Sequence, residues 1–147
     1  MLQHNFAYVQ KAEEQAGDRL MSDLNSLQNR FVWVDIPVAN LDRAQQFYAA
    51  VLDITVHKEQ FGDVSFCVLD HKDGNGGCLV ENAAEVSAKG ALVYLNVDKR
   101  IQDAVAKVES NGGSIITPIH AIGPHGFRAV IIDGEGNRVA LHSTVDS

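Results

Sequence analysis

"FVWVDIPVANLDRAQQFYAAVLDITV", residues 31–56, is matched in pattern by "ALVYLNVDKRIQDAVAKVESNGGSIIT", residues 91–117. Each stretch opens with alternating apolar residues, which predicts a half-buried strand, and continues with apolar residues at helical spacing. Trp33 aligns with Leu92, so that Val34, Ile36 and Val38 correspond to Val93, Leu95 and Val97 on the expected buried faces. The chain therefore contains an internal repeat that begins with a strand and a helix.

Each repeat continues beyond its helix with shorter strands. "VSFCVLD" and "GGCLVEN" in the first half are answered by "FRAVIID" and "NRVALH" in the second. The expected helices have their apolar stripes at Leu41, Ala44, Tyr48 and Val51, and at Ile101, Ala104, Val105 and Val108. Asn40 suits the N-cap of the first helix, and Asn111-Gly112-Gly113 predicts a left-handed end to the second. We therefore predict an α+β fold of tandem βαβββ units, forming a curved mixed sheet whose uncovered faces enclose a cleft.

The length of 147 residues suits one folded domain with a substantial core. We expect a domain over residues 31–147, with repeat one at about 31–81 and repeat two at about 91–143. Residues 1–30 are expected to form an N-terminal helical appendage, because apolar residues recur on one helical face from Leu2 onward.

Charge and composition limit the classes of partner and the cellular location that can be expected. The chain has 12 Lys and Arg against 19 Asp and Glu, a net charge of −7, which disfavours nucleic acid and anionic membrane surfaces. It contains no apolar run long enough to span a bilayer and no secretory signal pattern, so a cytoplasmic location is expected. Cys67 and Cys78 lack metal-type spacing and are expected to be free, buried thiols.

The stretches "IPVANLDRAQQFYAAVL", "YLNVDKRIQDAVAKVESNGG" and "IIDGEGNRVALHS" resemble the vicinal oxygen chelate superfamily, which includes glyoxalase I, bleomycin-resistance proteins and extradiol dioxygenases. The resemblance covers about residues 31 to 143 and is strongest to the bacterial glyoxalase-like group related to lactoylglutathione lyase. It implies a cleft that binds a small molecule, and it implies a homodimer.

The resemblance also implies a divalent metal held by His, Gln or Glu side chains from four strands. Carried onto this chain, those four positions fall at Trp33, Val80, Leu92 and Ala140, none of which can ligate a metal. We therefore expect no metal cofactor and no lactoylglutathione lyase activity by the family's metal mechanism.

The residues of opposite parity to the buried series are expected to line the cleft. The candidate ligand-binding residues are Trp33, Asp35, Tyr94, Asn96, His125, Arg138 and His142. His125, in the loop "GPHGF", and Asp35 are the candidates for acid–base catalysis. His4, His57, His71 and His120 show no paired spacing and are interpreted as surface residues.

Several functions stay open. The leading hypothesis is a small-molecule-binding protein that lacks the family's metal ligands and could be a metal-independent enzyme. One alternative is a ligand-sequestering dimer like the bleomycin-resistance proteins. Another is a metal-dependent lyase or dioxygenase with noncanonical ligands, for which His125, His142 and Asp35 are the candidates. A third is an interaction module whose cleft is filled by its own side chains.

Overall fold

The computed structural model describes residues 29–147. The predicted appendage, apart from residues 29 and 30, and His4 lie outside the described residues. The first repeat consists of β1 (Trp33–Val38), α2 (Leu41–Leu52), β2 (Val56–Phe61), β3 (Val64–Leu69) and β4 (Gly76–Glu81). The second consists of β5 (Val93–Asn96), α3 (Ile101–Ser110), β6 (Ser114–Ala121), β7 (Phe127–Ile132) and β8 (Arg138–Ser143). Short 3₁₀ helices, η1 (Ala83–Glu85) and η2 (Gly123–His125), lie in the connections. The predicted tandem βαβββ units are confirmed.

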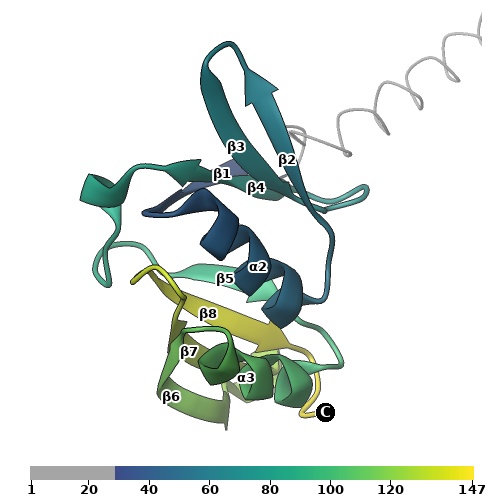
Figure 1. Ribbon diagram of the computed structural model, residues 1–147. Helices are drawn as coiled ribbons and strands as arrows, with labels where there is room; N and C mark the ends of the chain where they lie inside the picture. The colour runs from purple at the N-terminus through teal and green to yellow at the C-terminus, as the bar shows by residue number, and fades with distance from the viewer. Residues whose placement is uncertain (1–28) are drawn as a thin grey trace, which may run out of the picture.

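The strands form two four-stranded mixed sheets, one from each repeat. Sheet A has the order β1-β4-β3-β2 and sheet B has the order β5-β8-β7-β6. In both, the first strand of the repeat pairs parallel with the last, and the other pairs are antiparallel. The β2–β3 hairpin of sheet A projects away from the rest of the molecule (Figure 1).

The predicted start of α2 and the predicted end of α3 are confirmed. Asn40 caps α2, since its Oδ1 accepts a hydrogen bond from the backbone N–H of Arg43 at 2.9 Å. α2 ends at Asp53, which adopts the left-handed conformation with φ of 54°. After α3, Gly112 takes a φ of 95°, in agreement with the predicted left-handed stop.

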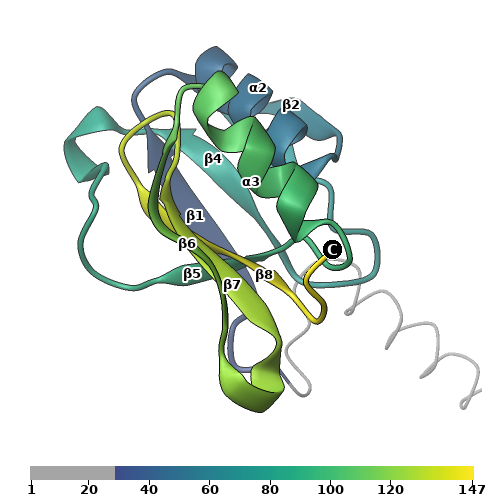
Figure 2. The ribbon, with the colours of Figure 1, turned by 90° about the horizontal axis from the view of Figure 1, so that it is seen from below.

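The helices lie side by side and cover the same side of the molecule (Figure 2). Beneath them, apolar residues from both sheets form one hydrophobic cluster with the helix stripes. Its sheet members include Ile36, Val38, Leu79, Leu95, Ile131 and Leu141, and its helix members include Phe47, Tyr48 and Ile101. Because each sheet buries its helix-facing side in this shared core, the opposite sides, here called open faces, are covered by no helix among residues 29–147.

A buried polar network in the β7–β8 turn supports this arrangement. The Oδ1 atom of Asp133 accepts hydrogen bonds from the backbone N–H groups of Glu135, Gly136 and Asn137, at 2.8 to 2.9 Å. Its Oδ2 atom accepts one from the Tyr48 hydroxyl at 2.5 Å. Burial, and then the nearby Asp133 charge, hold the pKa of Tyr48 well above its ordinary value, so the hydroxyl keeps its proton. The turn is thereby fixed to helix α2 of the other repeat.

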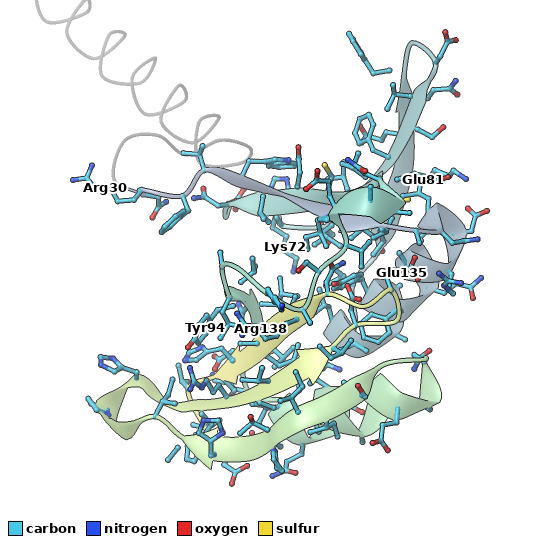
Figure 3. The ribbon with its side chains drawn as sticks, turned by 90° about the vertical axis from the view of Figure 1, so that its left-hand side faces the viewer. Arg30, Lys72, Glu81, Tyr94, Glu135 and Arg138 are labelled. Carbon is cyan, nitrogen blue, oxygen red and sulfur yellow. The ribbon has the colours of Figure 1, made fainter. Side chains whose placement is uncertain are left out.

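Glu135, in the same turn, caps the start of α2 (Figure 3). Its carboxylate accepts hydrogen bonds from the backbone N–H groups of Ala39 at 2.9 Å and Asn40 at 2.7 Å, and from Nε of Arg43 at 2.5 Å. Burial alone would raise the pKa of Glu135, but the hydrogen bonds from Arg43, Asn40 and Ala39 outweigh it and keep the pKa below its ordinary value. The second repeat therefore supplies part of the N-terminal cap of the first repeat's helix.

Candidate functional site

Strand register places a row of polar side chains across the open face of sheet B. Arg128 of β7 lies opposite His120 of β6 and opposite His142 of β8, and His142 lies opposite Asn96 of β5. Directly opposite residues in neighbouring strands project on the same face, so these four side chains share the open face. Tyr94 of β5, two residues before Asn96, lies on the same face.

Arg128 is the cation at the centre of this row. Its Nε donates a hydrogen bond to Nε2 of His120 at 3.1 Å, and its Nη1 donates to the hydroxyl of Tyr94. The guanidinium carbon also lies 5.9 Å from the centre of the Tyr94 ring. Within residues 29–147, no carboxylate forms an ion pair with Arg128. The guanidinium is thus positioned by uncharged partners, and no carboxylate of the described residues neutralises its charge.

The hydrogen bonds of His120 define its protonation. Nδ1 of His120 lies 2.8 Å from the carbonyl oxygen of Pro118, which can only accept, so Nδ1 is the nitrogen that carries the hydrogen. Nε2 must then be the acceptor for Arg128, which makes His120 a neutral imidazole in this arrangement.

His142 is oriented by the loop that contains His125. Nε2 of His142 lies 2.6 Å from the backbone carbonyl oxygen of His125, and therefore donates to it. The next residue, Gly126, has a φ of 91°, and a Cβ there would lie 2.4 Å from the carbonyl oxygen of Ser143. Only glycine allows the loop to approach β8 so closely. The loop thereby fixes one nitrogen of His142 and leaves the other, Nδ1, without a protein partner among the described residues.

These side chains surround a cavity of about 550 Å³ that opens to solvent. Its lining consists of Tyr94, Ile122, His125, Arg128 and His142. The structure thus brings together three residues that the sequence predicts for a binding site, namely Tyr94, His125 and His142. It adds Arg128 and its supporting residue His120, which the sequence interpretation did not select.

Trp33 and Asp35 lie elsewhere, on the open face of sheet A. The Asp35 carboxylate accepts a hydrogen bond from the Cys78 thiol, with Sγ and Oδ1 3.2 Å apart. Burial, together with this bond, raises the pKa of Cys78 to about 11. Trp33 makes an edge contact with His71, with the ring centres 5.6 Å apart. Asp35 and His125, the two predicted acid–base groups, therefore come from different repeats and are not brought together.

Asn96 and Arg138 line other cavities, although both lie in strands of sheet B. Asn96 lines a second cavity of about 440 Å³ between the two sheets, to which Tyr94 also contributes. Arg138 lines a third of about 140 Å³, and its Nη2 donates to the carbonyl oxygen of Gly90 at 2.7 Å. Figure 3 labels Tyr94 and Arg138 on sheet B. The contact with Gly90 indicates that Arg138 supports the linker between the repeats.

The strand register revises one of the four family metal positions. Ala140 lies opposite Tyr94, which follows Leu92 by two residues. In the first repeat, the residue opposite Asp35, which follows Trp33 by two, is Cys78. Cys78 is therefore the counterpart of Ala140, and the assignment to Val80 was wrong by two residues, because a strand's position against its neighbour cannot be counted along the chain.

The revised set, Trp33, Cys78, Leu92 and Ala140, does not fit the family's metal. An indole only donates hydrogen bonds, alkyl groups have no lone pairs, and the one thiol keeps its proton and donates to Asp35. In the part of the chain from residue 29 onward, no three His, Cys, Asp or Glu side chains gather as a metal site would require. The alternative set is divided between the two repeats, with Asp35 in the first and His125 and His142 in the second.

No helix within residues 29–147 is both long enough and apolar enough to cross a membrane.

Comparison with known proteins agrees with this architecture. Residues 30–141 match the family model described as Glyoxalase/Bleomycin resistance protein/Dioxygenase superfamily. No curated protein matches the chain.

Several solved structures share the fold at low sequence identity. An enzyme of the glyoxalase/bleomycin resistance protein/dioxygenase family from Burkholderia phytofirmans has a TM-score of 0.61 and 17% identity, over 76% of this chain and 96% of its own. The fosfomycin resistance protein FosX from Listeria monocytogenes has a TM-score of 0.60 and 10% identity, over 80% of this chain and 94% of its own. Glyoxalase I from Zea mays has a TM-score of 0.57 and 21% identity, over 76% of this chain and 45% of its own.

At these identities the solved structures bear on the fold alone, whereas the family model spans most of the sequence and both βαβββ units. The chain belongs to the glyoxalase/bleomycin resistance protein/dioxygenase superfamily.

Proposed function

We propose that this protein binds a small anionic molecule in the cavity on the open face of sheet B, without the metal ligands of its family. The observation that carries the proposal is Arg128, a guanidinium in the cavity wall that is held in place by His120 and Tyr94 and has no carboxylate partner within residues 29–147. A guanidinium is suited to carboxylates and phosphates, because its planar donors match their oxygens.

Local charge supports an anion more than a cation. The chain as a whole carries a net charge of −7, yet the cavity lining contains one arginine, two histidines and no carboxylate. A cation would meet no opposite charge there. The protein's overall negative charge would slow an anion's approach, but it acts at longer range and is screened by salt.

A competition between matched probes tests the proposal. We expect benzoate and phenylacetate to bind the full chain, and benzamide and benzyltrimethylammonium to bind more weakly, as measured by ligand-observed NMR. Binding of the carboxylates should weaken in the Arg128→Met variant, which keeps the aliphatic stem and removes the charge, and should be unchanged in Arg43→Met, a control on another surface. Equal binding of the carboxylates by Arg128→Met and the unmodified protein would refute the proposal.

The absence of a bound metal is part of the same proposal and has its own test. Its support is the side-chain chemistry at Trp33, Cys78, Leu92 and Ala140. Protein purified without chelator and offered Zn²⁺, Ni²⁺ or Mn²⁺ should retain less than one equivalent after gel filtration, as measured by elemental analysis. If the protein retains one equivalent of metal and the Cys78→Ser variant does not, the proposal that the site holds no metal is contradicted. Acid–base chemistry without a metal would then be the form of any enzymatic activity.

We also propose that the protein is a homodimer that uses the open face of sheet A. Two apolar side chains at the end of the β2–β3 hairpin, Phe61 and Val64, are 83% and 56% exposed, which is unfavourable unless a partner covers them. Light scattering should give twice the monomer mass for the full chain and the monomer mass for Phe61→Asp. If the unmodified chain is a monomer at micromolar concentration, the dimer is excluded.

The two cysteines, Cys67 and Cys78, are free thiols, as is usual in a reducing compartment, and this supports a cytoplasmic location. Cell fractionation followed by immunoblotting would test it.

A further inference from the structure

The hydrogen-bonding atoms left over around the cavity limit the class of ligand further. Nη2 of Arg128 has no partner among the described residues, since Nε and Nη1 make the two recorded bonds. The Tyr94 hydroxyl accepts a bond from Arg128 and keeps its own proton available for donation. Two donors are therefore free at the same point of the cavity wall, which suits the two oxygens of one carboxylate.

The remaining free atom on His142 has the opposite character. Since Nε2 donates to the carbonyl oxygen of His125, Nδ1 carries no hydrogen and is an acceptor whenever the ring is neutral. The ring centres of His142 and Tyr94 lie 6.2 Å apart and both side chains line the same cavity, so one small ligand can reach both. A ligand that fills the site must bring a donor there, because an acceptor unmatched by a donor loses its hydrogen bond to water.

We infer that the cavity takes a small carboxylate with a hydroxyl group on the neighbouring carbon, its carboxylate on Arg128 and Tyr94 and its hydroxyl donating to Nδ1 of His142. This inference rests on the proposed function and makes it narrower. A carboxylate that has no hydroxyl, or whose hydroxyl is methylated, can bind Arg128 and Tyr94 but cannot donate to His142. His120 supports the arrangement by holding Arg128, and His125 contributes through its backbone carbonyl rather than its imidazole.

Three probes of nearly the same shape separate the possibilities. Mandelate carries the hydroxyl donor, O-methylmandelate keeps the oxygen but has no donor hydrogen, and phenylacetate has neither. Calorimetric titration of the full chain should give an affinity for mandelate at least about fivefold above that for each of the other two, the size expected for one half-exposed hydrogen bond. If phenylacetate binds as tightly as mandelate, the inference is overturned. Any weaker binding of O-methylmandelate would then be explained by the size of its methyl group and not by the missing hydroxyl donor.

Variants assign the preference to an atom. His142→Phe keeps an aromatic ring beside Tyr94 and removes both nitrogens, so the mandelate preference should fall to about one. His125→Ala removes an imidazole of the cavity lining but keeps the backbone carbonyl that orients His142, so the three affinities can change together while their ratio should not. A preference that follows His125 instead of His142 would overturn the assignment, and the probe series on the unmodified chain decides the ligand class even if His142→Phe fails to fold.

Failure of the inference and failure of the proposed function give different results. If all three carboxylates bind equally and all are weakened by Arg128→Met, the anion site stands and the hydroxyl preference is wrong. If none depends on Arg128, the proposed function fails and the inference fails with it.

Discussion

Replacement of Glu135 by alanine should destabilise the protein more than any loss of an exposed ion pair would. The carboxylate accepts from the backbone N–H groups of Ala39 and Asn40 as well as from Nε and Nη2 of Arg43, at 2.5 to 3.0 Å. The Glu135 side chain is fully buried, whereas that of Arg43 is 56% exposed. Alanine leaves the start of α2 without its acceptor and breaks the contact between the two repeats.

The expected loss of stability in Glu135→Ala follows from these contacts. Hydrogen bonds to a charged group contribute about 1.5–3 kcal/mol each when buried, but water can reach the freed N–H groups, and an exposed ion pair is worth at most about 1 kcal/mol. We therefore expect Glu135→Ala to lower the free energy of unfolding by about 2–3 kcal/mol, with a fall in Tm of about 6–10 °C. Glu135→Gln keeps one acceptor oxygen for the two backbone donors but turns an NH₂ group toward Arg43, so about 1–2 kcal/mol should be lost.

Urea unfolding followed by circular dichroism measures these differences. Arg43→Ala isolates the exposed ion pair and should cost less than about 1 kcal/mol. Glu59→Ala is the matched control and should stay within about 0.5 kcal/mol, because the side chain of this exposed glutamate on β2 makes no hydrogen bond or ion pair within residues 29–147. If Glu135→Ala costs no more than Arg43→Ala, the backbone contacts contribute nothing and the argument is refuted.

Further expectations concern buried groups and pH. Tyr48→Phe removes the hydroxyl that donates to Asp133 at 2.5 Å, and should lower the free energy of unfolding in urea by about 1.5–3 kcal/mol with an unchanged m-value. A loss below about 0.5 kcal/mol would mean that this hydrogen bond is replaced at no cost. Since the pKa of Glu135 is lowered in the folded protein, its contribution is complete above the unfolded value of about 4.3 and is lost as pH falls through the folded pKa. Unfolding free energies measured from pH 6 to pH 3 should consequently fall more steeply for the unmodified chain than for Glu135→Gln, and parallel curves would argue against it. Burial raises the pKa of both thiols, that of Cys78 to about 11, so neither Cys67 nor Cys78 should react with Ellman's reagent at pH 7.5 until urea is added; rapid reaction in the native state would contradict the buried assignment.

The fold could be predicted because its signals are local. Alternation in β1 and β5, the stripes of α2 and α3, the cap at Asn40 and the stop at Gly112 each depend on residues within a few positions of one another. Because the two repeats share one pattern, each element predicted in one repeat could be compared with its counterpart in the other. The residue contacts that fix Glu135 to the start of α2, almost a hundred positions away, carry no such local signal.

The candidate site was predicted in part. Parity along β5 and β8 selected Tyr94 and His142, and the turn chemistry of "GPHGF" selected His125. The same parity applied to "FRAVIID" would have selected Arg128, because Arg128 and Val130 lie on the same face of the sheet as Ala140. His120 could not be found in this way, because the register shifts between Ile115 and His120 interrupt the alternation of β6.

By itself the sequence determined the two βαβββ units, their helix ends and the unsuitability of Trp33, Leu92 and Ala140 as metal ligands, since these depend on residue type and short-range spacing. Only the tertiary structure decided that His120, Arg128 and His142 form one row, that Trp33 and Asp35 belong to the other sheet, and that Cys78 rather than Val80 is the counterpart of Ala140. The physical reason is strand register. Pairing depends on turns, bulges and packing between distant segments, and it fixes which side chains meet.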